Sequence, residues 1–115
     1  MTIYCFDLDD TICFPNSEFK DSERKYSQAL PNLAVIETVR NLYSEKHEII
    51  IFTARRMLTH QGDIEKIKSD VEKITNDWLI EHMVPFNQLI FGKPYADHYI
   101  DDKAVPLDRL QEIVL

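Results

Sequence analysis

The stretch TIYCFDLDDT (residues 2–11) begins with an apolar run and ends in three carboxylates and a hydroxyl. Residues 2–6 are rich in strand formers and show no alternation of apolar and polar positions, which is typical of a strand buried on both faces. Such strands occur in parallel sheets that are covered by helices. The carboxylates of Asp7, Asp9 and Asp10 follow the strand directly, at the edge where α/β sheets bind their ligands. The stretch therefore predicts the first strand of an α/β fold and its functional edge.

The remaining elements can be placed outward from this strand. Further apolar runs predict strands at Glu48–Phe52, Gln88–Phe91 and His98–Ile100. Helical spacing predicts a helix from Pro31 to Tyr43, a longer one from the candidate N-cap Asp63 to Leu79, and a short one around Leu107, Leu110 and Ile113, with Pro85 after the long helix. This order is typical of a wound α/β sheet with right-handed crossovers. We expect the strand order fourth, third, first, second, with helices on both faces.

Length and charge limit the classes of protein to consider. The 115 residues fit one domain, residues 1–115, and the net charge of −7 disfavours nucleic acids and anionic membranes as partners. There is no signal-peptide pattern and no apolar run long enough to cross a bilayer, which predicts a cytoplasmic protein. Cys5 and Cys13 match no zinc-binding spacing, so we expect both to be reduced and Cys5 to lie in the core.

The segment Phe14–Leu30 is polar and longer than a usual connection between a strand and a helix. It follows the first strand directly, so it would lie close to the functional edge of the sheet. Long loops in compact domains often have a functional role. We therefore predict that residues 14–30 form a flap over the active site.

Polar and charged residues follow each of the four expected strands. They are Asp7, Asp9, Asp10 and Thr11 after the first, Thr53 and Arg55 after the second, Lys93 after the third, and Asp101 and Asp102 after the fourth. Clustered carboxylates repel one another unless a cation lies between them, and oxygen ligands favour Mg²⁺. The hydroxyl of Thr53 and the ammonium of Lys93 could then donate hydrogen bonds to a phosphate. The combination predicts Mg²⁺-dependent phosphoryl transfer.

These residues resemble the four sequence motifs of phosphatases of the haloacid dehalogenase (HAD) superfamily. The matching positions are residues 6–11, Thr53, Lys93 and the pair Asp101-Asp102. The chain is most similar to small members identified as capsule or polysaccharide biosynthesis phosphatases, through residues 26–31, 53–55, 92–95 and 99–103. The resemblance implies a HAD-like Rossmannoid three-layer α/β fold with a small parallel sheet and no cap domain.

The resemblance also implies a role for each motif residue. Asp7 would attack phosphorus as the nucleophile, and Asp9 would act as general acid and then as general base. Thr53 and Lys93 complete the implied catalytic set, and Thr11 and Arg55 are candidate substrate-binding residues. The implied Mg²⁺ ligands are the side chains of Asp7 and Asp101 and the backbone carbonyl of Asp9. Asp102 would either reach the metal through a water molecule or orient Lys93.

The substrate and the quaternary structure are left open by the sequence. The resemblance implies a small phosphorylated sugar or polyol from surface-polysaccharide synthesis, and the net charge favours this over a nucleotide or a nucleic-acid end. A non-catalytic phosphate-binding regulatory module is an alternative of a different class. The presence of both Asp7 and Asp9 favours an enzyme. A homo-oligomer, in which a neighbouring subunit contributes to specificity, is compatible with the sequence.

Overall fold

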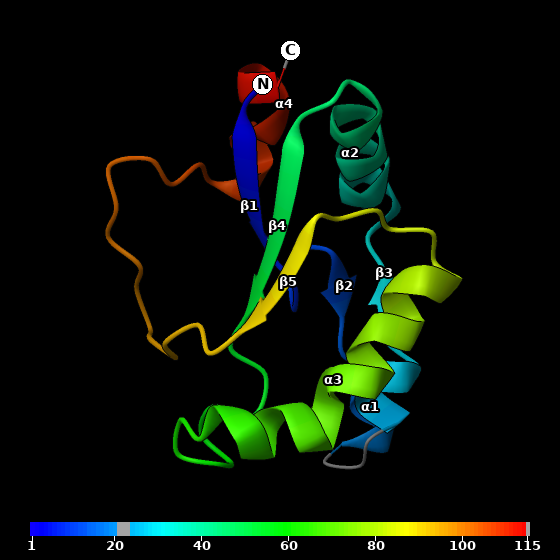
Figure 1. Ribbon diagram of the computed structural model, residues 1–115, viewed down its shortest axis with the longest axis vertical. Coiled ribbons are helices and arrows are strands. Elements are labelled where there is room, and N and C mark those ends of the chain that lie inside the picture. Colours follow the sequence, from blue (N-terminus) through cyan, green and yellow to red (C-terminus); the bar gives the residue numbers. More distant parts are fainter. Residues whose placement is uncertain (21–23, 115) are drawn as a thin grey trace.

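Three parallel strands form the centre of the fold in a computed structural model, which describes residues 1–20 and 24–114 (Figure 1). The strands are β1 (Ile3–Asp7), β4 (Glu48–Thr53) and β5 (Gln88–Phe91). Helix α2 (Leu33–Ser44) connects β1 to β4, and helix α3 (Ile64–Glu81) connects β4 to β5. The predicted small α/β fold with a parallel sheet is confirmed, and no cap domain is present within the described residues.

The strand order differs from the predicted one. The sheet is ordered β1-β4-β5, so β4, the second of the predicted strands, lies at the centre, and β5, the third, lies beside it. Each of the two connections, through α2 and through α3, therefore joins strands that are neighbours in the sheet, and both run across the sheet in the same direction. Right-handed crossovers of this kind place both helices on one face of the sheet. The local sequence pattern carries no information on crossover direction, which is why the predicted order was wrong.

One face of the sheet is covered more completely than the other. The covered face carries Tyr4, Phe6, Ile49, Ile51, Thr53, Leu89 and Phe91, which pack with residues of α2 and α3. On the opposite face, Ile3 and Ile90 are exposed, and so is Cys5. The prediction that Cys5 is a core residue was therefore wrong, because its side chain points away from the helices. Cys13 is the buried cysteine.

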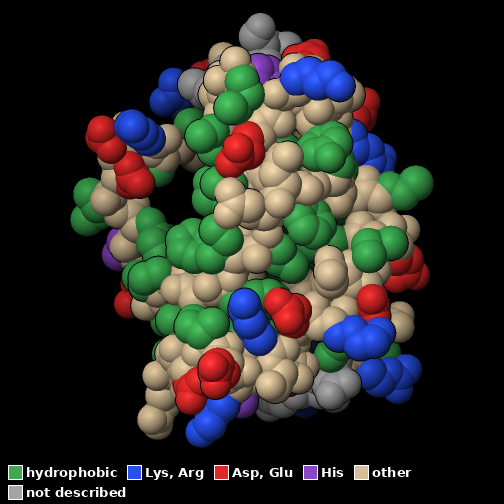
Figure 2. All heavy atoms as spheres, viewed as in Figure 1, with side chains coloured by type: hydrophobic (Ala, Val, Ile, Leu, Met, Phe, Trp, Pro, Cys, Tyr) green, Lys and Arg blue, Asp and Glu red, His purple; other side chains and the backbone are tan. Residues whose placement is uncertain are grey.

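The fourth predicted strand is absent from the structure. Residues 98–100 have no strand partner among the described residues, and the side chain of Ile100 is 99% exposed. The hydroxyl of Tyr99 donates a hydrogen bond to the Pro94 carbonyl and accepts one from the Ala96 N–H, so the segment folds back on itself. Figure 2 shows an open gap between this segment, at the left of the view, and the body of the molecule. The prediction of a strand at 98–100 was wrong because no neighbouring strand hydrogen-bonds to it.

A second, two-stranded sheet closes the segment that follows β1. Strands β2 (Cys13–Phe14) and β3 (Leu30–Pro31) pair antiparallel, and η1 (Ser17–Phe19) and α1 (Arg24–Ser27) lie between them. Pro31 belongs to β3 and not to the first helical turn as predicted, because it pairs with Cys13. Asp21 and Glu23, which belong to the predicted flap, lie outside the described residues.

The helix ends follow the sequence signals closely. Asp63 caps α3 by accepting a hydrogen bond from the Lys66 N–H, and the helix ends four residues before Pro85. The predicted terminal helix is present as η2 (Leu107–Arg109) and α4 (Leu110–Val114). No helix in the described residues is long and apolar enough to cross a membrane.

Candidate active site

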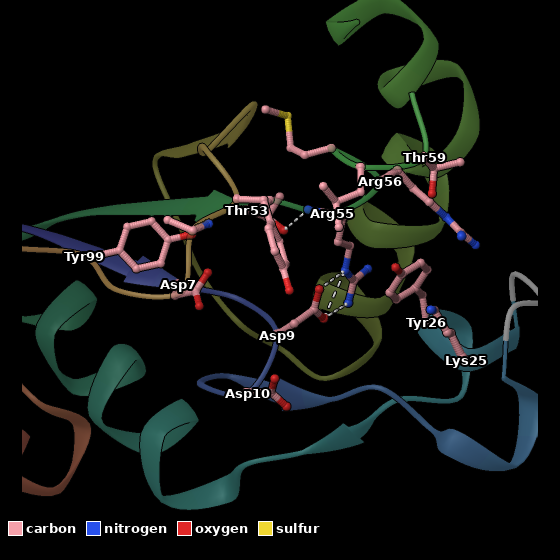
Figure 3. A pocket seen from close by; sticks show the side chains of 15 residues that line it. Asp7, Asp9, Asp10, Lys25, Tyr26, Thr53, Arg55, Arg56, Thr59 and Tyr99 are labelled. Atoms are coloured by element: carbon pink, nitrogen blue, oxygen red, sulfur yellow. Dashed lines mark hydrogen bonds and ion pairs between the residues drawn. The ribbon is translucent and has the colours of Figure 1, made fainter. Parts of the chain in front are cut away.

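A cavity of about 470 Å³ opens at the carboxyl ends of β1 and β4 (Figure 3). Its lining combines three carboxylates, two arginines, a lysine and three tyrosines. The lining residues are Asp7, Asp9, Asp10, Lys25, Tyr26, Thr53, Ala54, Arg55, Arg56, Met57, Leu58, Thr59, Tyr95, Ala96 and Tyr99. The register of the sheet explains the convergence, because Asp7, the last residue of β1, pairs with Phe52, one residue before Thr53 at the end of β4. The predicted functional edge is thus the site of the cavity.

Asp7 lies at the end of β1, next to a lysine. The Lys93 Nζ is 3.4 Å from Asp7 Oδ1, and it also lies 4.3 Å from the centre of the Tyr99 ring. Lys93 is positioned by the backbone, because the N–H groups of Gly92 and Lys93 both donate to the Thr53 carbonyl. Burial raises the pKa of the Asp7 carboxyl, and the nearby Lys93 offsets this only in part. Asp7 is therefore a carboxylate with incomplete charge compensation.

Asp9 makes a bidentate ion pair with Arg55. The Arg55 Nε donates to both carboxylate oxygens, at 3.1 Å to Oδ1 and 3.0 Å to Oδ2, and Nη2 donates to Oδ1 at 2.8 Å. The Cys13 thiol lies 3.5 Å from the same Oδ1, and burial raises the Cys13 pKa to about 12, so the thiol is a proton donor. Asp9 therefore has a defined orientation in the cavity.

Thr53 is buried at the end of the central strand. Its side-chain oxygen accepts a hydrogen bond from the Arg55 N–H at 3.1 Å, which leaves the hydroxyl proton available for another acceptor. The turn that follows Thr53 contains Arg56, whose positive φ of 59° directs the chain away from the sheet. The turn thus brings Arg55 towards Asp9, whereas Arg56 points away from Asp9 and lies near the Tyr26 ring (Figure 3).

Four of the predicted site residues lie outside the cavity lining. Lys93 is one of them, although its Nζ lies 3.4 Å from Asp7 Oδ1, which lines the cavity. The Thr11 carbonyl accepts a hydrogen bond from Asn32 Nδ2, and Thr11 does not line the cavity. Asp101 and Asp102 lie in the exposed segment after β5. The Asp101 carboxylate accepts the Lys103 N–H, and this hydrogen bond lowers the Asp101 pKa. Residues 1–20 and 24–114 contain no group of three or more Asp, Glu, His or Cys side chains that could by itself hold a metal ion.

Two residues that support the site, Tyr26 and Thr75, were not predicted from the sequence as site residues. The Tyr26 ring lies 4.2 Å from the Arg55 guanidinium carbon, and Thr75 of α3 accepts a hydrogen bond from Arg55 Nη1 at 2.9 Å. Thr75 could have been found, because it is a polar residue in the buried stripe that also contains Ile67, Val71 and Trp78. Tyr26 was part of the resemblance through residues 26–31, but this implied no role for it, because one aromatic residue in a polar segment has no distinctive pattern.

Residues 2–96 match the model of a family that is described as polynucleotide kinase 3 phosphatase. The chain belongs to this family. The polynucleotide kinase 3 phosphatase family is HAD-like, which confirms the predicted superfamily and a phosphatase class of enzyme. The family match does not extend to the capsule-biosynthesis subgroup.

Solved structures support the same fold. The crystal structure of a target protein from Vibrio cholerae is 35% identical, with a TM-score of 0.84, and the match covers 98% of this chain and 89% of that one. Chains from a Pnkp1/Rnl/Hen1 complex and from the Pnkp1/Rnl/Hen1 RNA repair complex are 16% and 17% identical, each with a TM-score of 0.59. These matches cover 97% of this chain but only 34% and 32% of those chains, so they indicate the fold alone. No curated protein matches the chain.

Proposed function

We propose that the protein is a Mg²⁺-dependent phosphomonoester hydrolase in which Asp7 is the nucleophile and Asp9 is the general acid and base. The observation that carries this proposal is that both carboxylates line one cavity, each with its own cation. Lys93 lies next to Asp7, whereas Arg55 binds Asp9. Two carboxylates in different environments can perform different tasks on the same phosphate. The phosphatase family of the chain supports the same reaction class.

The proposed reaction has two steps. An oxygen of Asp7 attacks phosphorus, the bond to the leaving oxygen breaks, and a proton from Asp9 goes to that oxygen. Asp9 then takes a proton from the water that attacks the aspartyl phosphate, which releases inorganic phosphate and free Asp7. Asp9 Oδ1 has three contacts and Oδ2 has one, so Oδ2 has the capacity to carry the proton.

The donor groups in the cavity fit Mg²⁺. This ion usually binds to proteins through one or two carboxylates and completes its coordination with water and substrate phosphate. Asp7 provides one such carboxylate, and the burial that raises its pKa favours a neighbouring cation. We propose Asp7 and the Asp9 carbonyl as ligands, and Thr53 and Lys93 as donors to the phosphate oxygens. Bound Mg²⁺ would reduce the charge repulsion between Asp7 and the phosphate.

We retain Asp101 and Asp102 as proposed metal ligands, although both are exposed in the structure. Binding would require residues 95–102 to approach the free edge of β1, because Asp7 lies at the end of that strand. The side chain of Ile100 and the outer face of β1 are both exposed and could be covered by this movement. We also propose Thr11 as a substrate contact, because it follows Asp10 directly in the motif of residues 6–11.

A small phosphorylated sugar or polyol is the first candidate substrate. The cavity has a volume of about 470 Å³, and tyrosines and methionine contribute to its wall. Pockets of this size suit small molecules, and the net charge of −7 disfavours polyanions. A nucleic-acid 3′-phosphate is the second candidate, because the family is described as a polynucleotide kinase 3 phosphatase. The cations Lys25 and Arg56 line the cavity and could contact a second phosphate of such a substrate.

The test is a comparison of turnover with and without Mg²⁺. The proposal predicts Mg²⁺-dependent release of phosphate from p-nitrophenyl phosphate, which EDTA abolishes and added Mg²⁺ restores. A panel of sugar phosphates, polyol phosphates, mononucleotides and 3′-phosphorylated oligonucleotides would then rank kcat/KM by substrate class. A highest value for the oligonucleotide would reject the first candidate substrate, and no turnover of any phosphomonoester would reject the proposed function.

A further inference from the structure

Arg55 is held from several sides by the protein interior. Its side chain is 1% exposed, its Nε and Nη2 groups donate to Asp9, and its Nη1 donates to Thr75. The ring of Tyr26 lies against the guanidinium, with 4.2 Å between the guanidinium carbon and the ring centre. Figure 3 shows the guanidinium directed at Asp9, with Tyr26 beside it. These contacts restrict the side chain to one orientation, so Arg55 is better suited to position Asp9 than to bind substrate.

Thr75 is the partner that lies outside the cavity. It belongs to the buried stripe of α3, its exposed fraction is 1%, and it is absent from the cavity lining. A buried guanidinium N–H without an acceptor costs free energy, so the Thr75 hydroxyl favours the orientation in which Nη1 points at α3. Because the guanidinium is planar, this orientation also fixes the directions of Nε and Nη2. The position of Asp9 thus depends on a hydroxyl of α3.

We propose that Thr75 is a positioning residue for proton transfer, which acts through Arg55 to keep Asp9 Oδ2 directed at the leaving oxygen of the substrate. The inference rests on the proposed function, because it requires Asp9 to be the general acid. Without the Thr75 hydroxyl, the guanidinium can rotate and Asp9 can follow it. Transfer of a proton from Asp9 then becomes slower, while substrate binding is unaffected.

The leaving group of the substrate provides a selective test. Phenyl phosphate needs a proton on its departing oxygen, whereas the nitrophenolate that leaves p-nitrophenyl phosphate is stable as an anion. The two substrates have similar sizes, and kcat/KM reports the step in which Asp7 displaces the leaving group. A defect in general acid catalysis therefore lowers kcat/KM for phenyl phosphate more than for p-nitrophenyl phosphate. A general loss of folded protein lowers both equally.

The decisive variant is Thr75→Val, which replaces the hydroxyl by a methyl group of similar size. We expect kcat/KM for phenyl phosphate to fall by about 10-fold or more, and that for p-nitrophenyl phosphate to fall much less. Thr75→Ser keeps the hydroxyl and should retain the wild-type ratio of the two values. Thr38→Val is the matched control, because Thr38 is also a buried helical hydroxyl outside the cavity lining, but it belongs to α2 and its partners are Ala34 and Gln111. It should not change the ratio.

The outcomes separate this inference from the proposed function. Equal losses on both substrates for Thr75→Val, or a Thr75→Ser variant as defective as Thr75→Val, would overturn the inference. If Thr75→Val does not fold, as judged by circular dichroism, Thr75→Ala makes the same comparison. Asp9→Asn should lower the phenyl phosphate value more strongly than any Thr75 variant. A normal substrate ratio in Asp9→Asn would overturn the proposed role of Asp9, and the inference with it.

Discussion

The motif residues of this phosphatase occupy two regions with very different structural support. Asp7 and Thr53 lie at the ends of β1 and β4, which pair in register over five residues from Ile3 to Asp7. Asp101 and Asp102 lie in a segment that pairs with no strand in the part of the chain that the structure describes, and the side chain of the adjacent Ile100 is 99% exposed. Both regions were predicted from the same kind of sequence signal, a short apolar run followed by carboxylates.

The difference shows what brings a motif residue to a site. In β1 and β4 the backbone hydrogen bonds of the sheet fix the level at which each strand ends, and so fix the relative positions of the carboxylate and the hydroxyl. A motif residue on an unpaired segment has no such constraint. The proposed roles of the two regions should therefore respond differently to substitution.

The largest effect is expected at the paired region, from Asp7→Asn. The substitution removes the nucleophile and its negative charge, so turnover of p-nitrophenyl phosphate should fall below detection. The side chain is at the cavity, outside the hydrophobic core, so circular dichroism and the melting temperature should change little. Retained activity in a folded Asp7→Asn variant would show that another group attacks phosphorus.

A smaller effect is expected at the unpaired region, from Asp101→Asn. If the segment approaches the free edge of β1 and Asp101 binds the metal, the Mg²⁺ concentration for half-maximal turnover should rise by about 10-fold or more. Asp97→Asn is the matched control, because Asp97 is another exposed carboxylate of the same segment. Identical Mg²⁺ titrations for the two variants would indicate that Asp101 stays away from the active site, as it does in the structure.

The smallest effect is expected at Gly92, where the sheet meets the unpaired segment. Gly92 has a φ of +101°, and a Cβ there would lie 2.6 Å from Ile64 Cδ1. Gly92→Ala should lower the free energy of unfolding by about 1–3 kcal/mol, through backbone strain and through the close contact of the new Cβ with Ile64. Gly62→Ala is the control, because Gly62 also has a positive φ but its nearest atom would be at 3.9 Å. Urea denaturation should show a smaller loss for Gly62→Ala; an equal loss would mean that the Ile64 contact has no effect.

Features that depend on residues close together in the sequence could be predicted from the sequence. The β1 strand with its trailing carboxylates, the Asp63 cap and the length of α3 were all recognisable in local patterns. The strand order was not, because crossover direction is decided by packing of whole helices on the sheet. The exposure of Cys5 followed from that same arrangement, since both helices cover the opposite face.

The convergence of the candidate catalytic groups could be predicted from the sequence, but the residues that hold Arg55 in place could not. Asp7 and Thr53 end strands, whereas Asp9 and Lys93 follow them, and the structure places these four at one end of the sheet. Thr75 is 20 residues from Arg55 in sequence, and Tyr26 comes from a different element. Such contacts depend on how α1 and α3 pack, which a single sequence does not specify.

The short β2–β3 ladder has a consequence for how this enzyme can diversify. It joins Cys13 and Phe14 to Pro31 and Leu30, so residues 15–29 form a closed loop that contributes Lys25 and Tyr26 to the cavity wall. The entropy of loop closure grows only with the logarithm of loop length, and doubling the length costs about 0.6 kcal/mol. Insertions within the loop are therefore thermodynamically inexpensive while the ladder is intact. Relatives can accordingly vary the wall that faces the substrate without altering the sheet that carries the carboxylates.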